Sequence, residues 1–477
     1  MRGLATLFGR VVSRFGEPYA GRDVEHRCAA RAVSAERPRA TTPKRVKAVR
    51  MRAVRLILGS VVVLSLVGGC ADDEQAVTTV LRVANWGGAQ VESEFVKLER
   101  RLREEFEALH PGVRVQVEQI PGDGQYAPKL LMMHVTGSVP DVISLDASSA
   151  AVFINNNVLR DLTPFVERDT KFDLGDYFEN VANIARRGER LYAIPLDFTP
   201  MVMYYNKKLF DAAGVPYPRA GWTCADFLET AKGLTVRSDD SRKALAQYGV
   251  NFENVMPFWV PWLWTGGGDV LDPSGKKASG YLDGPETTRA MRFLVDLMTK
   301  HRVAPHLKES AAAGVDLFRD ERAAMQLKGH WMMIDYQADG IDFGVVGLPT
   351  NTGRRVTVIY ETGLSITSKS DYPELAWQYI KFMTSKDVQV RRVASGLAIS
   401  ANKEAAAQYA GDPIEDAFIE EVAYARPPWG ATVERYPFIE ELGREMMEDI
   451  LYSDGELPVE EALRQTAKLI DAALAEP

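Results

Sequence analysis

The sequence predicts an α/β protein built as two lobes joined by a hinge. In residues 80–145, apolar runs typical of strands alternate with helical periodicity, in the order strand, helix, strand, helix, strand. In residues 191–210, LYAIPLDFTPMVMYYNKKLF, two strand-like apolar runs flank a short step marked by a proline. That pattern is typical of a chain that leaves one folded lobe and enters another. After residue 210 the alternation resumes with more helix, which indicates a second α/β lobe.

The elements of the first lobe are predicted from local signals. Apolar side chains recur at steps of three and four residues between Phe95 and Phe106, which predicts a helix that Pro111 ends. The patterns predict, in order, a strand, a helix, a strand, a helix and a strand over residues 80–86, 92–110, 113–120, 125–135 and 141–145. This order predicts a mostly parallel sheet in the first lobe.

The rest of the chain is predicted to be richer in helix. Helical periodicity covers residues 224–234, 255–264, 285–301, 329–338, 374–384, 436–452 and 459–474. Strand-like apolar runs cover residues 343–348, 356–360 and 363–367.

A lipoprotein signal peptide is predicted at residues 51–69. Two arginines precede an apolar run that ends at residue 67, and this run is shorter than the ~20 residues that a membrane-spanning helix needs. The run leads into VGGC, residues 67–70, which resembles a bacterial lipobox. We therefore expect Cys70 to carry a lipid that anchors the protein to the outside of the bacterial cell membrane. An ordinary secretory signal that ends near a cysteine is the alternative.

The position of the signal peptide also predicts the segments before and after it. Residues 70–78 are expected to be a polar tether. A signal peptide fifty residues into a chain is unusual, so we expect translation to start at Met51. Residues 1–50 would then be an upstream extension that is either not native or disordered.

Charge and cysteine content exclude some functions for the chain after residue 69. The whole sequence has 65 Asp and Glu against 57 Lys and Arg, and the arginine-rich leader leaves a stronger acidic excess in the remainder. A chain this acidic repels phosphate backbones and anionic lipid, so no nucleic-acid partner is expected. The cysteines of this part are Cys70 and Cys224, so lipidation of Cys70 would leave no pair for a disulfide.

Catalysis has little support in the sequence. The histidines show no H-E-x-x-H spacing, and no G-x-S-x-G elbow is present. We expect no metal, no cofactor and no enzymatic activity. A carboxylate pair of the glycosidase kind stays open, because such pairs are defined by their separation in space.

Segments in the middle of the chain resemble one family in the same order. They are YAIP, YYNKKLFDAAGVPYP and GWTCADF within residues 192–227, LFRDERAAMQLKGHWMM at 317–333, FGVVGLP at 343–349 and AWQYIKFMTS at 376–385. Their order resembles the family 1 extracellular solute-binding proteins of carbohydrate ABC importers, the maltose-binding-protein-like group. The resemblance spans most of the chain from residue 78 onward.

The resemblance implies a two-lobed, type II periplasmic-binding-protein-like fold. Residues 79–195 and 363–411 would form lobe 1, and residues 196–362 and 412–477 would form lobe 2. It implies a monomer, anchored to the membrane by its lipid, that captures a carbohydrate, a disaccharide or an oligosaccharide, between the lobes and delivers it to an ABC transporter permease. The alternatives are a sensing or adhesion lipoprotein, a binder of polyols or glycerophosphodiesters, and a secreted carbohydrate-active enzyme.

Site residues are predicted where strands end and where the lobes join. Trp86 and Asp146 follow strands, at the edge where open α/β sheets bind ligands. Packing of Trp86 and helix capping by Asp146 are the alternatives. Asp197 and Thr199 lie in the predicted hinge and are expected to face the space between the lobes. Asp269 follows a run of glycines after a tryptophan-rich helix.

Aromatic side chains are expected to hold the sugar, because a pyranose presents an apolar face to a ring and polar groups at its edge. The resemblance matches Trp331, in KGHWMM, to a tryptophan that stacks on the sugar in several members. Among the tryptophans before Asp269, we expect Trp262 to be a second stacking surface.

Two charged residues have two interpretations each. Glu361 stands where many relatives have a small residue, which suggests a ligand-specific carboxylate or a hinge salt bridge. Arg426 matches an arginine of some disaccharide-binding members and either bridges two hydroxyls or pairs with an acid. The full set of predicted ligand-binding residues is Trp86, Asp146, Asp197, Thr199, Trp262, Asp269, Trp331, Glu361 and Arg426.

Overall fold

The computed structural model describes residues 79–87, 94–121, 125–237, 246–307, 309, 316–351, 353–396, 398–453 and 455–476. The expected upstream extension, the signal peptide, Cys70 and the tether lie outside these ranges. Within the described ranges, no helix is long and apolar enough to cross a membrane.

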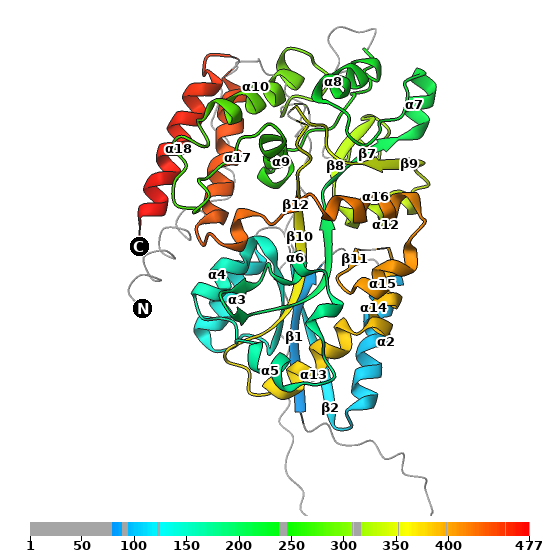
Figure 1. The fold of residues 1–477 in the computed structure, drawn as a ribbon, viewed down its shortest axis with the longest axis vertical. Helices are drawn as coiled ribbons and strands as arrows, with labels where there is room; N and C mark the ends of the chain where they lie inside the picture. Colours follow the sequence, from blue (N-terminus) through cyan, green and yellow to red (C-terminus); the bar gives the residue numbers. More distant parts are fainter. Residues whose placement is uncertain are drawn as a thin grey trace, which may run out of the picture. The chain divides into compact units, whose positions relative to one another are not determined.

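One sheet has seven strands and lies mainly in the lower half of Figure 1. Its strands are β1 (Thr79–Gly87), β2 (Val113–Pro121), β3 (Val142–Asp146), β6 (Ile194–Pro200), β10 (Thr357–Ile366), β11 (Ile399–Ser400) and β12 (Ala425–Arg426). Their order is β11-β6-β10-β3-β1-β2, and β12 pairs with β10. β1 is parallel to β2 and β3, whereas β10 is antiparallel to β3 and β6. The expected parallel arrangement is therefore found around β1 and in the short β10–β12 pair, and the other pairs are antiparallel because β10 enters this sheet from the other lobe.

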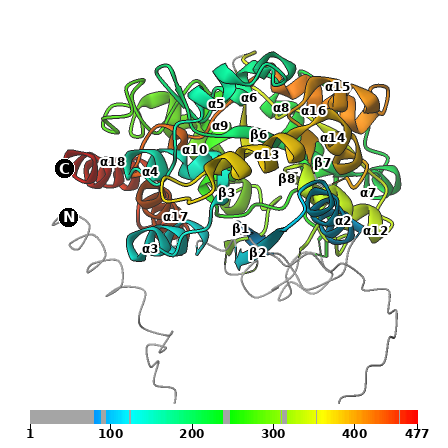
Figure 2. The ribbon, with the colours of Figure 1, turned by 90° about the horizontal axis from the view of Figure 1, so that it is seen from below.

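Helices cover both faces of the seven-stranded sheet, with α3 and α4 on one side and α2 and α14 on the other (Figures 1 and 2). The helices of this lobe are α2 (Glu94–Leu109), α3 (Tyr126–Thr136), α4 (Ala150–Asn155), α5 (Thr163–Arg168), α6 (Glu179–Ala182), α13 (Pro373–Thr384), α14 (Lys386–Val393) and α15 (Lys403–Ala406). Shorter elements are the 3-10 helices η1 (Ala147–Ser149), η2 (Leu174–Asp176) and η4 (Ala407–Tyr409) and the strands β4 (Arg186–Arg187) and β5 (Arg190–Leu191). α2 buries Leu98, Leu102 and Phe106, at the spacing that predicted it.

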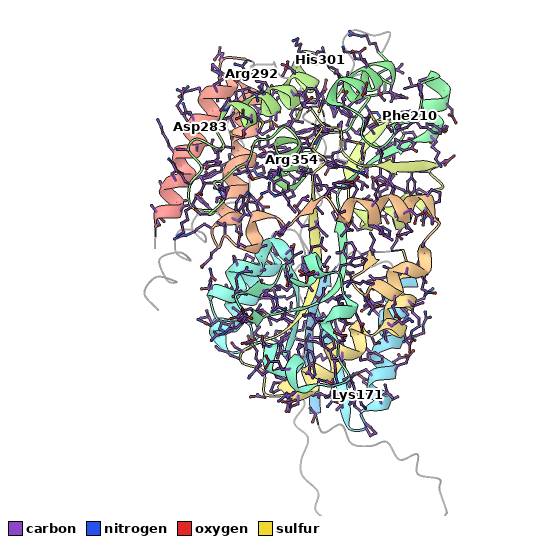
Figure 3. The ribbon with its side chains drawn as sticks, in the orientation of Figure 1. Lys171, Phe210, Asp283, Arg292, His301 and Arg354 are labelled. Atoms are coloured by element: carbon purple, nitrogen blue, oxygen red, sulfur yellow. The ribbon has the colours of Figure 1, made fainter. Side chains whose placement is uncertain are left out.

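A second sheet of three antiparallel strands, in the order β8-β7-β9, lies in the upper half of Figure 1. Its strands are β7 (Val202–Asn206), β8 (Met325–Lys328) and β9 (Phe343–Val346). The helices around it are α7 (Lys207–Ala213), α8 (Cys224–Gly233), α9 (Met256–Thr265), α10 (Pro285–Thr299), α12 (Met333–Ala338), α16 (Pro413–Val422), α17 (Tyr436–Tyr452) and α18 (Val459–Ala475), with the 3-10 helices η3 (His330–Met332) and η5 (Trp429–Ala431). Figure 3 shows Phe210, on α7, in this lobe and Lys171 in the other.

Two predicted elements differ from the structure. Residues 356–360 and 363–367, expected as two strands, form the single strand β10, because pairing with β6 continues through Glu361 and Thr362 with only a register shift before Gly363. The helix expected over residues 329–338 begins as the tighter helix η3 and becomes α-helical at Met333.

Two paired strands connect the lobes. β6 continues through Met201 into β7, and β10 runs beside β6 in the opposite direction. Met201 N donates to Val358 O at 3.0 Å, so the hydrogen-bonded ladder is not broken at the step. α16 packs against both β6 and β9 and is a third element shared by the two sheets. The lobes therefore join within the segment predicted as the hinge, while their exact boundaries stay a prediction.

Candidate functional site

Asp146 lies at the end of β3, where the two lobes meet. Its Oδ1 accepts hydrogen bonds from Ser148 N at 2.7 Å and from Ser148 Oγ at 2.8 Å, so it caps η1. This is the capping role given above as the alternative to ligand contact. The backbone of Gly430, in η5, lies so close that a Cβ there would be 1.8 Å from Ser148 O. The segment leading into α17 therefore closes directly onto the end of β3.

The register of β10 against β3 pairs Thr362 with Asp146, so the backbone of Glu361 lies next to this pair and its side chain lies on the opposite face of the sheet from that of Thr362. Glu361 is 3% exposed, and its Oε2 has no hydrogen-bond partner among the described residues. Burial, and then the negative charges of Asp146 and Asp197, raise its pKa well above the ordinary value. No described cation forms an ion pair with it. The hinge salt bridge is thus not formed with the described residues, and the ligand-specific carboxylate stays a prediction.

Glu440 brings a third carboxyl group to this place from the other lobe. It lies on α17, which packs against η1. Burial and then the charge of Asp146 raise its pKa to about 8, and its Oε1 is shielded without a partner among the described residues. Burial and the charge of Glu440 also raise the pKa of Tyr436 well above its usual range. Below, Asp146, Glu361 and Glu440 are called the junction acids.

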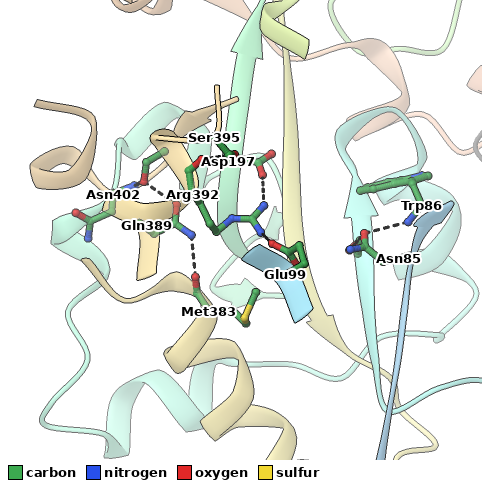
Figure 4. Close-up of polar contacts among 11 residues, drawn as sticks. Asn85, Trp86, Glu99, Asp197, Met383, Gln389, Arg392, Ser395 and Asn402 are labelled. Carbon is green, nitrogen blue, oxygen red and sulfur yellow. Dashed lines mark hydrogen bonds and ion pairs between the residues drawn. The ribbon is translucent and has the colours of Figure 1, made fainter. Parts of the chain in front are cut away.

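Trp86 ends β1 at the same edge of the sheet. Its ring packs on the ring of Tyr126 with 4.8 Å between centroids, and it is partly buried. Burial and, to a lesser degree, the charge of Asp146 raise the pKa of Tyr126. Figure 4 shows the neighbouring Asn85, whose Oδ1 accepts from Trp86 N at 2.9 Å. Packing of Trp86 is thus observed, and a contact with ligand stays a prediction.

Asp269 and Arg426 come together as an ion pair, although 157 residues separate them. Arg426 Nη2 lies 2.9 Å from Asp269 Oδ2, and the guanidinium carbon lies 4.3 Å from the centre of the Trp264 ring. Trp264 and Trp429 each donate their Nε1 to Asp269 Oδ1 at 2.8 Å. Of the two interpretations of Arg426, the structure shows the pairing with an acid. A direct role of either residue in ligand binding stays a prediction.

Asp197 is held within its own lobe. Its Oδ2 lies 3.0 Å from Nη2 of Arg392 on α14, and Arg392 also pairs with Glu99 on α2 (Figure 4). Asp197 and Arg392 line a cavity of about 10 Å³, which is smaller than the space a sugar ring needs. Asp197 thus links β6 to α14 directly and to α2 through Arg392. Its contact with ligand stays a prediction.

Thr199 and Trp331 lie on either side of His330, where β6 leaves the large sheet. Thr199 Oγ1 accepts from His330 N at 2.8 Å, and His330 Nε2 lies 3.0 and 3.1 Å from the two carboxyl oxygens of Glu415 on α16. Thr199 and His330 are buried, which favours a role inside the hinge. Trp331 is only partly buried, and its ring covers Gly329, where a Cβ would lie 2.1 Å from it. Trp331 therefore keeps a surface free of the core.

Trp262 lies in the core of the second lobe, which is unlike the stacking surface that we expected. It is 6% exposed, and its ring centre is 5.0 Å from that of Phe227 and 6.1 Å from that of Phe293. The neighbouring cavity measures about 20 Å³, enough for a water molecule and not for a sugar. α9 is apolar on every side, so its periodicity does not separate a packing tryptophan from a ligand-facing one.

Three residues of the junction were not predicted as ligand-binding residues: Tyr436, Glu440 and Trp429. Glu440 and Tyr436 lie on an amphipathic helix, where a carboxylate normally faces water, and the sequence holds no sign that this turn meets another lobe. Trp429 follows two prolines in ARPPWG, and an aromatic residue in such a loop is the one signal that favours a site over a core.

Solved structures define the class of fold. An ABC substrate-binding protein of Listeria monocytogenes, in complex with cycloalternan, is 23% identical, covers 84% of this chain and 100% of its own, and has a TM-score of 0.74. The maltotriose-binding protein of Thermus thermophilus, bound with maltotriose, is 20% identical, covers 83% of this chain and 100% of its own, and has a TM-score of 0.67. The chain has the two-lobed, type II periplasmic-binding-protein fold of these proteins.

Sequence comparison gives the family. Residues 88–390 match the model of the bacterial extracellular solute-binding proteins, and the chain belongs to this family. A putative binding protein of Brucella abortus is 22% identical over 311 residues, which are 64% of this chain and 72% of that protein. The arabinooligosaccharide-binding protein of Halalkalibacterium halodurans is 25% identical over 292 residues, 57% of this chain and 60% of that protein. Membership places the protein outside the cytoplasm and among binding proteins, not enzymes.

Proposed function

We propose that the protein captures a carbohydrate, an oligosaccharide or disaccharide, between its lobes and delivers it to an ABC permease. In this proposal lobe 1 comprises residues 79–195 and 363–411, lobe 2 comprises residues 196–362 and 412–477, and a lipid on Cys70 keeps the protein at the membrane. The observation that carries the proposal is the junction itself, where carboxyl groups and aromatic rings from both lobes meet beside the connecting strands.

The chemistry of the junction suits a sugar. Carboxyl groups form hydrogen bonds with hydroxyl groups, and the oxygens of Glu361 and Glu440 that have no partner among the described residues are available for such bonds. Trp331 offers a ring surface for the apolar face of a pyranose. The relatives whose names include maltotriose and arabinooligosaccharide support a carbohydrate over other solutes.

Delivery of the sugar to a permease requires that the bound sugar change the conformation of the protein. A ligand that contacts both lobes stabilises the closed form by the difference between its affinities for the closed and open forms. A permease then distinguishes the closed surface from the open one. Glu361 lies in the connecting strand β10 and Glu440 on α17, so a sugar that contacted both residues only in the closed form would have this differential affinity.

A ligand screen tests the proposal. The protein is titrated with mono-, di- and trisaccharides, polyols and glycerophosphodiesters while its melting temperature and its tryptophan fluorescence are recorded. We expect saturable stabilisation by a carbohydrate, with a change of emission over the same concentrations. Stabilisation by a polyol or a glycerophosphodiester alone, or no response from folded protein, would overturn the carbohydrate proposal.

A further inference from the structure

His330 lies where η3, the connecting strands and α16 meet. Its backbone N–H donates to Thr199 Oγ1 in β6 at 2.8 Å, and its Nε2 lies 3.0 and 3.1 Å from the two carboxyl oxygens of Glu415 on α16. The preceding residue, Gly329, accepts a hydrogen bond at its carbonyl oxygen from Tyr204 Oη on β7, at 3.1 Å. The start of η3 is therefore fastened to β6, β7 and α16, which are the elements that pass between the two sheets or pack against both.

The pair of His330 and Glu415 is enclosed by protein. The side chain of His330 is 1% exposed and that of Glu415 is 8% exposed. Phe418, one turn further along α16, packs on the imidazole with 4.8 Å between ring centres. Nδ1 of His330 has no hydrogen-bond partner among the described residues, so Nε2 is the nitrogen that holds the ring in place. Because little water reaches the pair, separating the two groups is costly, and the pair acts as a firm link.

α16 connects this link to both sheets. Glu415 lies in the first turn of α16, where the N-cap residue Asp412 accepts hydrogen bonds from Ile414 N and Glu415 N. The helix packs against β6 of the large sheet and against β9 of the small sheet. A movement of one sheet relative to the other therefore shifts α16 against at least one of them. Since Glu415 ties α16 to His330, the same movement also acts on η3.

Trp331 follows His330 directly in η3 and is only partly buried. The bonds of His330 fix where the backbone of Trp331 stands relative to the connecting strands. A sugar stacked on a ring in a fixed position fits one arrangement of the lobes better than another, and this difference in affinity drives closure. A ring on a loose turn would follow either arrangement, so most of the difference would be lost.

We infer that His330 and Glu415 are positioning residues that couple a sugar stacked on Trp331 to closure of the lobes. This inference rests on the proposed function and deepens it, because it assigns the coupling to a buried pair beside the predicted stacking surface. A pair that served only the stability of the fold would lower the melting temperature when removed and leave the response to sugar unchanged. The test therefore measures stability and the response to sugar separately.

Two alanine variants of the same helix make this separation. Glu415→Ala is compared with Glu421→Ala, which removes another buried carboxyl group of α16, one whose ion-pair partner is Arg355. Both changes should lower the melting temperature, because each leaves a shielded group without its partner. Glu415→Ala alone should also weaken binding of the sugar found in the screen by at least about tenfold. It alone should reduce the compaction that saturating sugar causes in solution scattering.

Conservative variants give the matching rescue. Glu415→Gln keeps an oxygen that can accept from Nε2, and His330→Gln keeps an N–H donor near the place of Nε2. Each should retain most of the sugar affinity and most of the compaction. His330→Leu, which removes the donor, should behave like Glu415→Ala.

Hydrogen exchange of the unmodified protein gives a readout that depends on no variant. The amide of His330 donates one of the bonds that carry the coupling. Saturating sugar should slow its exchange at least about fivefold more than it slows exchange of the Glu421 amide, since fivefold is the lower end of typical coupling between two sites. If Glu415→Ala does not fold, this measurement decides alone.

Two results would overturn the inference and leave the proposed function standing. One is equal sugar affinity and equal compaction in Glu415→Ala and Glu421→Ala, and the other is equal slowing of exchange at the two amides. A wild-type protein that is folded and binds no carbohydrate would instead overturn the proposed function, and this coupling with it.

Discussion

Trp331 is the residue whose surroundings agree best with its predicted role. It is partly buried, its ring covers Gly329, and it lies in η3 next to His330, whose backbone N–H donates to Thr199 Oγ1. A partly exposed ring that packs against the core provides a stacking surface at little conformational cost. Trp262, which we predicted as the second stacking surface, is buried in the core.

We expect Trp331→Ala to weaken carbohydrate binding by at least about tenfold, because it removes one stacked ring. The melting temperature of the ligand-free protein should change little, since only part of the ring packs on the core. Calorimetric titration with the sugar found in the screen gives the affinity, and Trp331→Phe should retain most of it. Equal affinities of wild type and Trp331→Ala would remove this residue from the site.

Glu440 should make the ligand-free protein less stable as pH rises. Its pKa is about 8 in the folded state and about 4.3 in an unfolded chain, so the folded state binds more protons between these values. Stability is then lost as pH rises through this window. The melting temperature should fall less steeply from about pH 5 to about pH 8 in Glu440→Gln than in wild type. Glu445→Gln, which makes the same change at an exposed site on α17, is the matched control, and equal slopes in all three proteins would contradict the assignment.

At the scale of elements, η5 packs tightly against η1. A side chain at Gly430 has no room, because its Cβ would lie 1.8 Å from Ser148 O. Asn155, the last residue of α4, and Asn156, which follows it, also donate to Glu434, in the segment just before α17, at 3.0 Å each. These contacts join the two sides of the junction.

Gly430→Ala should therefore shift the protein toward an open form. We expect sugar affinity to fall by about tenfold, with a larger radius of gyration in solution scattering and a melting temperature close to that of wild type. Asn155→Ala with Asn156→Ala removes exposed hydrogen bonds between the same elements without a clash and should have a smaller effect in the same direction. A Gly430→Ala protein as compact and as tightly binding as wild type would contradict this role.

Elements with strong periodicity were predicted well, and elements defined by contacts between lobes were not. The pattern from Leu98 to Phe106 located α2, and the apolar runs at β1, β2 and β3 located these strands. β10 was divided into two because Glu361 and Gly363 interrupt an apolar run, although their backbone pairs with β6 without a break. Asp146 was recognised as a site candidate from its strand end, whereas Glu440 was not, because a helical carboxylate carries no sign of the lobe that will cover it.

At the scale of the whole molecule, the proposed function needs the protein to stay near its permease. The described residues contain no membrane-spanning helix, and Cys70 lies outside them. In cells, Cys70→Ser should move the protein from the membrane fraction to the soluble fraction, because the sulfur that would carry the lipid is gone. Incorporation of a labelled fatty acid should be lost in the same variant. A Cys70→Ser protein that still fractionates with membranes would contradict the lipid anchor.

In the proposed binding mode, a sugar bridges the two lobes at the end of β3, beside the connecting strands and the junction acids. A crystal structure with the tightest-binding carbohydrate from the screen tests this binding mode most directly. We predict electron density for the sugar between η1 and α17, within hydrogen-bonding distance of Glu361 or Glu440 and in contact with Trp331. Density on an outer face of one lobe, with the junction unchanged, would contradict it.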